Sequence, residues 1–239
     1  MGPRGLTEKR SHAVTGWVIN HVRGSAADLF AWEPTGRPEV RLLSVTKPAL
    51  VLGSTQSADL ACVLPEADIV RRRSGGGAVW LDADVVWVDV VVPASHHFHQ
   101  TDVGRAFHWL GDVWCEAIGM TDAQVHRGPL VRSSWSSLVC FAGLGPGEVR
   151  VAGRKVVGIS QRRTRTWSLF QSAVSLVWDS ARTVRALRLD DHTAQTLDTA
   201  LRELAAGWPV AGAARVTTER VHELFVAALH TADTQELRA

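Results

Sequence analysis

The sequence predicts an α+β fold in which a mixed, largely antiparallel β-sheet is flanked by helices. Strand-like apolar runs dominate the middle of the chain, and amphipathic helical patterns lie at its start, middle and end. This order differs from the regular alternation of strand and helix that builds a parallel sheet. The 239 residues suit one large domain, 46% of them are apolar, and no repeat or linker divides them.

Apolar runs bounded by glycine and proline predict the strands. Eight such runs are expected, over residues 40–45, 49–52, 69–72, 78–81, 85–92, 148–151, 155–163 and 167–178. The run over residues 85–92 shows no clean alternation, which is typical of a central strand with both faces buried. Gly153 and Arg154 form the predicted turn into the strand over residues 155–163, whose antiparallel partner is the run over residues 167–178.

Helical spacing and capping residues predict the helices. Short helices are expected after Ser25, which can cap free N–H groups, and over residues 57–61. Thr101 is the predicted cap of a longer helix that ends at Gly119. Two more amphipathic helices close the chain, lined by Leu197, Leu201, Leu204 and Ala205 and by Val221, Leu224, Phe225 and Ala228.

Composition predicts the organisation and location of the chain. Residues 1–15 are polar and expected to be a flexible N-terminus, followed by a single domain over residues 16–239. The chain lacks a signal peptide and any run near the roughly 20 apolar residues of a membrane helix. Its net charge of +2 says little about partners, and neither nucleic acid nor a membrane is expected as one. Three widely spaced cysteines, Cys62, Cys115 and Cys140, favour a reducing cytoplasm.

The segment RRRSGGGAVW, residues 71–80, is the strongest local signal for a binding site. Gly75, Gly76 and Gly77 have no side chains to bury, so this backbone can approach a ligand closely and direct N–H groups toward it. The adjacent arginines add positive charge, which favours an anion. A tight hairpin with a solvated basic edge is the alternative. The segment matches neither a Walker loop nor a dinucleotide-binding fingerprint.

A second signal is the segment GRKVVGISQRR, residues 153–163. Lys155 stands at the start of an apolar strand, and Gly158 follows three residues later. A lysine directed into a pocket can hold an anion or polarise a carbonyl group. A lysine on an edge strand would instead protect that edge from pairing.

Together the two segments resemble the lipoate–protein ligases and octanoyltransferases, which are relatives of biotin–protein ligase. The ligase motif Arg-Arg-x-Ser-Gly-Gly-Gly-Ala-Val, followed by a spacer and Asp, is matched by Arg71, Arg72, Ser74, Gly75, Gly76, Gly77, Ala78, Val79 and Asp82. The motif Gly-x-Lys-hydrophobic-x-Gly-x-x-Gln-Arg is matched by Gly153, Lys155, Val156, Gly158, Gln161 and Arg162. Residues 48–56 resemble the family's Pro-x-x-x-x-Gly-x-x-Gln element, so the resemblance covers residues 17–178.

The resemblance implies a class II biotin/lipoate ligase-like catalytic domain that joins lipoate or octanoate to AMP with ATP and Mg²⁺. The acyl group would then pass to a lysine of a lipoyl domain of a 2-oxoacid dehydrogenase or of the glycine cleavage H protein. The matched residues of the glycine-rich segment, together with Asp82 and Gly158, would bind substrate and nucleotide. Lys155 would neutralise the phosphate and stabilise the oxyanion. Val79 and Val157 would line an acyl tunnel.

The sequence departs from the ligase pattern in two places. Leu81 stands where the ligase motif has His. The residues after Trp178 also provide no clear copy of the C-terminal accessory domain of full-length ligases, which some relatives obtain as a separate protein. We therefore expect a catalytic domain without that accessory domain.

The pair Cys140-Phe141 supports a second hypothesis. One branch of octanoyltransferases has a Cys-Phe pair upstream of the same Gly-x-Lys element and takes octanoate from acyl carrier protein without ATP. In this reading Cys140 is the nucleophile, Lys155 activates it, and no cofactor is needed. Gly77 stands where that branch usually has Arg, which favours a ligase. A structural cysteine, a non-catalytic relative that binds carrier domains, and biotin ligation remain alternatives.

His96, His97 and His99 form a histidine-rich segment. His97 and His99 would point the same way on a strand, but no carboxylate or further ligand stands beside them in the sequence. The segment is therefore predicted to be a loop leading into the helix capped by Thr101, and no metal site is expected.

Overall fold

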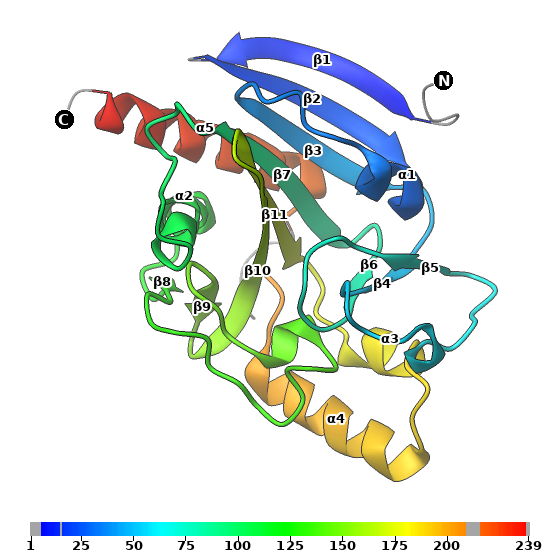
Figure 1. Ribbon diagram of the computed structural model, residues 1–239. Helices are drawn as coiled ribbons and strands as arrows, with labels where there is room; N and C mark the ends of the chain where they lie inside the picture. The colour runs from blue at the N-terminus through cyan, green and yellow to red at the C-terminus, as the bar shows by residue number, and fades with distance from the viewer. Residues whose placement is uncertain (1–5, 15, 209–215, 238–239) are drawn as a thin grey trace.

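The computed structural model describes residues 6–14, 16–208 and 216–237, which form two sheets and their flanking helices (Figure 1). The large sheet has the strand order β1-β2-β3-β7-β11-β10-β9-β8. Its strands are β1 (Thr7–Val14), β2 (Trp17–Gly24), β3 (Glu39–Val45), β7 (Val85–Pro93), β11 (Trp167–Ser175), β10 (Arg154–Arg163), β9 (Val149–Val151) and β8 (Gln124–Val125). Among these described strands only β2 and β3 pair in parallel. The predicted mixed, largely antiparallel sheet is confirmed.

A small sheet carries the predicted glycine loop. It consists of β5 (Asp68–Arg71), β4 (Ala49–Leu52) and β6 (Val79–Leu81), in that order. The central strand β4 pairs in parallel with β5 and antiparallel with β6. The loop between β5 and β6 therefore lies beside the turn that follows β4.

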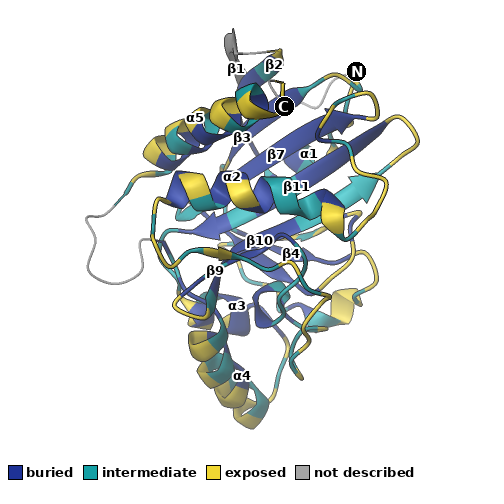
Figure 2. Cartoon of the chain, turned by 90° about the vertical axis from the view of Figure 1, so that its left-hand side faces the viewer, coloured by how far each residue is buried: buried dark blue, intermediate teal, exposed yellow. Residues whose placement is uncertain are grey.

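Helices cover the two sheets on their outer sides (Figures 1 and 2). The α-helices are α1 (Ala26–Ala31), α2 (His108–Ile118), α3 (Ser180–Arg185), α4 (Asp191–Leu204) and α5 (Thr218–Glu236). Three short 3₁₀ helices are η1 (Ala58–Leu60), η2 (Arg105–Phe107) and η3 (Cys140–Ala142). Figure 2 shows α2 and α5 in front of the large sheet, while α3 and α4 lie at the other end of the molecule. Within the described residues, no helix is long and apolar enough to cross a membrane.

The buried apolar residues form several separate hydrophobic cores, and alternate residues of a strand contribute to different ones. One core joins the large sheet to α2 and α5, and includes Val88 of β7, Trp114 and Phe225. A second lies between the opposite face of the large sheet and the small sheet, and includes Trp87. A third packs the small sheet against α3 and α4, with Leu197 at its centre. Neighbouring residues of β7 thus serve different cores, because successive side chains of a strand point to opposite faces.

Most predicted elements are confirmed. Ser25 caps α1 by accepting a hydrogen bond from the N–H of Asp28 at 3.1 Å. The eight predicted strands correspond to β3, β4, β5, β6, β7, β9, β10 and β11. Gly119 ends α2 in the left-handed conformation, with φ of 65°. The short helix α3 was not predicted; the carboxylate of Asp179 caps it.

The prediction that Thr101 caps a long helix is wrong. The first turn in this region is instead capped by Asp102, whose carboxylate accepts the N–H of Arg105 at 2.9 Å. That turn becomes η2, and α2 begins only at His108. Val103, expected on the buried face of the helix, is 59% exposed as a result.

The N-terminal segment differs from the predicted flexible residues 1–15. Thr7–Val14 form strand β1, which pairs antiparallel with β2. Residues 1–5 and 15 lie outside the described residues. Polar composition did not reveal this strand because an edge strand is held through its backbone and needs no continuous apolar face.

Burial of His222 in α5 makes stability depend on pH. Desolvation, with a smaller contribution from His21, lowers the pKa of His222 from 6.5 to about 4. A neutral ring therefore contributes stability above pH 6.5, and this contribution is lost as the pH falls through 4. We expect the stability advantage of the wild type over His222→Gln to shrink by up to about 3 kcal/mol over this range.

Urea unfolding at several pH values measures this difference. His192→Gln replaces an exposed histidine of α4 and should follow the wild type. The same pH dependence in His222→Gln and in the wild type would contradict the assignment.

Candidate active site

Lys155 is buried at the start of β10, where its ammonium group bonds to three protein acceptors. Nζ lies 2.7 Å from Oε2 of Glu148 and donates to the carbonyl oxygens of Cys140 and Gly143, each at 3.0 Å. The ring of Phe141 lies beneath it, with its centroid 5.0 Å from Nζ. Because β10 lies between β9 and β11, Lys155 is not the edge lysine of the alternative interpretation.

Glu148 is a site residue that the sequence analysis did not identify. Its side chain is buried, and besides Lys155 it accepts the N–H groups of Gly145 at 2.6 Å and Ile159 at 3.1 Å. These contacts satisfy a buried carboxylate and fix its position. Glu148 and Lys155 are close in sequence. A bulge in the pairing of β9 with β10 nevertheless prevents a prediction from sequence of which side chains face each other.

The glycine loop presents backbone N–H groups outward because Arg72 holds its carbonyl groups inward. Nη2 of Arg72 donates to the carbonyl oxygens of Gly75 at 3.0 Å and Gly77 at 2.9 Å. Gly76 between them has φ of +99°, which favours glycine. Among the described residues, no protein acceptor bonds to the N–H groups of these three glycines. These N–H groups therefore have the unpaired state that an anion nest requires.

The neighbouring arginines are bonded to the protein. Nη1 of Arg71 donates to the carbonyl oxygens of Gly53, Ser54 and Gln56, which fixes the turn after β4. Arg73 forms an ion pair with Glu33. Of the two arginines predicted to bind ligand, Arg72 lines the pockets described below, and Arg71 supports the loop from behind.

Two pockets meet beside the glycine loop. The larger is a polar pocket of about 370 Å³, lined by Gly75, Gly76, Gly77, Arg132, Glu148 and Lys155 among others. The smaller is a narrow apolar pocket of about 30 Å³, lined by Phe30, Val79, Leu81, Trp87, Phe141, Gly158 and Ala173 among others. Arg72, Cys140, Ile159 and Ser160 line both. An apolar space therefore adjoins a polar one at these four residues.

The two valines expected in the tunnel lie in different places. Val79 lines the apolar pocket, whereas Val157 lies in the core between the large sheet and helices α2 and α5. The expectation for Val157 is therefore corrected. It assumed regular alternation from Lys155, but the bulge between Lys155 and Val157 shifts the register.

Cys140 lies at the junction of the two pockets. It begins η3 and is half-buried, its N–H donates to the carbonyl oxygen of Ala78 at 2.9 Å, and its own carbonyl oxygen accepts from Lys155. Cys115 lines neither pocket, and burial with the nearby Asp112 raises the pKa of its thiol to about 11. A thiol is thus available where an acyl chain would meet the polar pocket.

Gly77 is required by the close approach of two backbone segments. A Cβ at this position would lie 2.5 Å from the carbonyl carbon of Val139 and 2.7 Å from the nitrogen of Cys140. Contacts this short exclude a side chain. Local packing alone therefore explains Gly77. Its presence does not distinguish a ligase from an octanoyltransferase.

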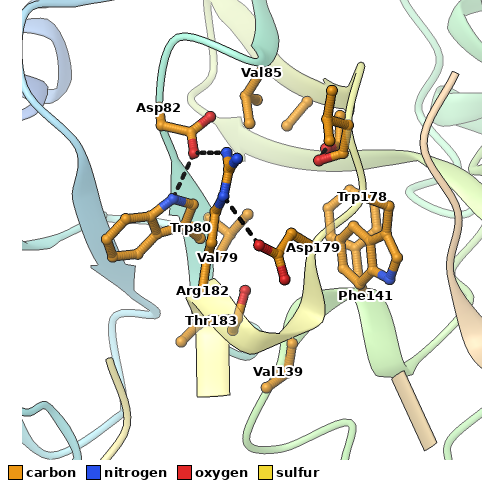
Figure 3. A pocket seen from close by; sticks show the side chains of 14 residues that line it. Val79, Trp80, Asp82, Val85, Val139, Phe141, Trp178, Asp179, Arg182 and Thr183 are labelled. Carbon is orange, nitrogen blue, oxygen red and sulfur yellow. Dashed lines mark hydrogen bonds and ion pairs between the residues drawn. The ribbon is translucent and has the colours of Figure 1, made fainter. Parts of the chain in front are cut away.

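Asp82 lies apart from the polar pocket, at the end of β6 (Figure 3). Its carboxylate accepts Nε1–H of Trp80 at 2.8 Å and forms an ion pair with Arg182 of α3 at 2.6 Å. Together with Ala78 and Trp178, it lines a further pocket, which shares Val79, Phe141 and Ala173 with the apolar pocket. Ser74 instead supports the site indirectly, since its hydroxyl contacts that of Ser160 at 3.2 Å. The structure thus does not bring every motif residue to Lys155.

A pair of substitutions tests the packing of the glycine loop. Gly77→Ala should lower the free energy of unfolding by about 1–3 kcal/mol, because the added methyl group overlaps the backbone of Val139. Gly75→Ala is the matched control, since a Cβ there meets nothing within 4 Å. The free energy of unfolding of Gly75→Ala should stay within about 0.5 kcal/mol of the wild-type value. Equal unfolding curves for the two variants in denaturant would refute this packing.

Sequence comparison identifies the family. The model of the lipoyl protein ligase A/B catalytic domain matches residues 25–229, which include the glycine loop, Cys140 and Lys155. A search of curated proteins gave no significant match.

Solved structures share the fold at low identity. A bi-partite lipoate protein ligase from Thermoplasma acidophilum has a TM-score of 0.65 at 15% identity, covering 85% of this chain and 74% of that chain. Lipoate-protein ligase A bound with ATP has a TM-score of 0.62 at 15% identity, covering 84% and 75%. A T. acidophilum structure with bound lipoic acid has a TM-score of 0.66 at 14% identity, covering 90% and 84%. Since the family model spans most of the sequence, this chain belongs to the enzyme family of lipoyl protein ligase A/B catalytic domains.

Proposed function

We propose that this enzyme activates lipoate or octanoate with ATP as acyl-AMP and transfers the acyl group to a lysine of a lipoyl carrier domain. The observation that carries this proposal is the meeting of an apolar and a polar pocket beside Lys155. Such a pair of spaces suits a molecule with an apolar chain at one end and a phosphate at the other. The fold shared with a ligase crystallised with ATP supports it.

The apolar pocket would hold the acyl chain. Phe30, Leu81 and Trp87 provide an apolar lining, and burial of each CH₂ group stabilises binding by about 0.8 kcal/mol. The carboxyl group of the chain would then reach the junction at Arg72 and Cys140. There the carboxylate oxygen would attack the α-phosphorus of ATP, and pyrophosphate would leave.

The polar pocket would hold the acyl-phosphate. The outward N–H groups of Gly75, Gly76 and Gly77 suit phosphate oxygens, and Lys155 lies on the same pocket. Because Lys155 bonds to three protein acceptors, a phosphate must replace one of them. The incoming lysine amine would attack the acyl carbonyl, AMP would leave, and Lys155 would stabilise the developing negative charge.

Magnesium fits this site only with help from the nucleotide. Glu148 is the carboxylate that lines the described part of the polar pocket, and it is bonded to Lys155. Mg²⁺ prefers oxygen ligands and commonly binds substrate phosphates, so the triphosphate would supply most of its ligands. The ion would neutralise phosphate charge when bound.

A second candidate is an octanoyltransferase that uses Cys140, favoured by the position of this residue on both pockets. Its thiolate would attack the thioester of octanoyl acyl carrier protein, and the carrier thiol would leave. The lysine of the lipoyl domain would then attack the new thioester, forming an amide and regenerating the thiol. This route needs no ATP.

The partners follow from the same chemistry. The acceptor would be the lipoyl domain of a 2-oxoacid dehydrogenase or the glycine cleavage H protein, and the reaction would take place in the cytoplasm. The T. acidophilum ligase, which is bi-partite, was studied with its E2 lipoyl domain. We propose that residues 16–239 form a single catalytic domain.

Two donors distinguish the candidate reactions. The protein is incubated with apo lipoyl domain and either octanoate with ATP and Mg²⁺ or octanoyl acyl carrier protein, and the carrier is weighed by mass spectrometry. Octanoylation only with ATP supports the ligase, and octanoylation only from the thioester supports the transferase. A carrier that gains no mass from either donor would refute both reactions and support a non-catalytic carrier-binding role.

Variants assign the roles within the site. Lys155→Ala should lower turnover by about 10²–10³-fold in either reaction, because it removes the donor nearest the developing charge. Cys140→Ala should abolish only the thioester-dependent reaction. Turnover unchanged in Lys155→Ala would show that the site lies elsewhere.

Glu148→Gln tests whether the carboxylate positions Lys155. We expect kcat to fall by about 10-fold or more, because the ammonium loses its anionic partner at 2.7 Å. Glu203→Gln, on the exposed side of α4, is the control. A kcat of Glu148→Gln equal to that of Glu203→Gln would argue against this role.

A further inference from the structure

We propose that His96, His97 and Asp233 bind a divalent cation of the zinc type, which joins helix α5 to the loop after β7. The two histidines follow β7, and Asp233 lies near the end of α5. None of them lines either pocket of the candidate active site. This proposal is therefore independent of the proposed function.

The potential ligand atoms converge. Nε2 of His97 lies 3.0 Å from Oδ1 of Asp233, and Nε2 of His96 lies 3.8 Å from the same oxygen. All three atoms lie within 4.8 Å of one another. Zinc binds such atoms at about 2.0–2.2 Å. The two imidazole nitrogens therefore need to approach each other by a small side-chain rotation for one ion to contact all three atoms.

The carboxylate of Asp233 provides an independent indication of a ligand. Its side chain is only 2% exposed, and in the part of the chain that the structure describes Oδ1 has no hydrogen-bond partner. The nitrogen of His97 is close, but its N–H direction does not meet the oxygen. The other described buried carboxylates all accept hydrogen bonds, at Glu39, Asp82, Asp89 and Glu148. A buried carboxylate oxygen without such a bond is costly, and a cation beside Oδ1 of Asp233 would satisfy it.

Aromatic neighbours hold the two imidazole rings in place. The ring of His96 lies 4.8 Å from that of Trp17, and the ring of His97 lies 4.5 Å from that of Phe98. Nδ1 of His96 accepts the N–H of Phe98 at 3.2 Å, so in the metal-free protein the ring proton is on Nε2. Binding through Nε2 moves this proton to Nδ1 and exchanges that hydrogen bond for a metal–nitrogen bond.

The donor set indicates the class of metal. Two imidazole nitrogens and one carboxylate oxygen suit Zn²⁺ or Co²⁺, whereas Mg²⁺ and Ca²⁺ prefer oxygen ligands alone. The side chain of His97 is 28% exposed, which gives an ion access from solvent and leaves room for a water ligand. This finding revises the expectation from sequence that no carboxylate accompanies the histidines, since Asp233 arrives from the distant end of the chain.

Metal titration of the full chain tests the proposal. After treatment with a chelator and its removal, the protein is titrated with CoCl₂, followed by visible absorption, and with ZnCl₂, followed by calorimetry. We expect one ion per chain and a higher melting temperature when Zn²⁺ is present, because the ion binds the folded state. Absence of stoichiometric binding of both ions would overturn the proposal.

Variants locate the ion. His97→Ala and Asp233→Asn should each weaken Zn²⁺ binding by about 10-fold or more, because even the loss of a residue that only orients a ligand has an effect of this size. Both variants should also abolish the rise in melting temperature. His192→Ala removes an exposed imidazole from α4 and should bind like the wild type. Circular dichroism checks that each variant folds, and His96→Gln replaces any variant that does not. Equal affinity in His97→Ala and His192→Ala would place the ion elsewhere.

Discussion

The buried ammonium group of Lys155 is the constraint on which the site depends. Removal of a charged amine from water is costly unless acceptors surround it. Here the acceptors are one carboxylate and two carbonyl groups of the turn that contains Cys140. The same contact that stabilises the lysine therefore also fixes the turn, and the turn closes the apolar pocket through Phe141. One set of bonds thus fixes both the ammonium group and a wall of the apolar pocket.

The glycine loop is fixed by comparable means from the opposite side. Arg72 holds the loop from within, and Ala78 exchanges backbone hydrogen bonds with the segment that precedes η3. The glycine loop and the turn at Cys140, which are far apart in sequence, are thus joined directly by backbone. The side chain of Lys155 then bonds to the same turn through the carbonyl oxygens of Cys140 and Gly143. In the proposed reaction, this network would hold the reacting groups in fixed relation.

Sequence patterns predicted the strands, the glycine loop and the presence of Lys155, because these depend on local periodicity and on residue types. They did not predict relations set by tertiary structure. The bulge in β10 turned Val157 away from the pocket. The carboxylate of Asp102 displaced Thr101 as the capping residue. Asp233 reaches His97 only because α5 crosses the large sheet, which no local pattern specifies.

The close contact of the turns at Gly53, at Gly76 and Gly77, and at Cys140 limits how the enzyme can diversify. A methyl group at Gly53 would overlap the carbonyl group of Gly76, and one at Gly77 would overlap the backbone of Val139 and Cys140. Side chains therefore cannot be added to these two glycine positions without moving the backbone. Variation in the shape of the apolar pocket must instead come from its walls, at positions such as Phe30 and Ala173.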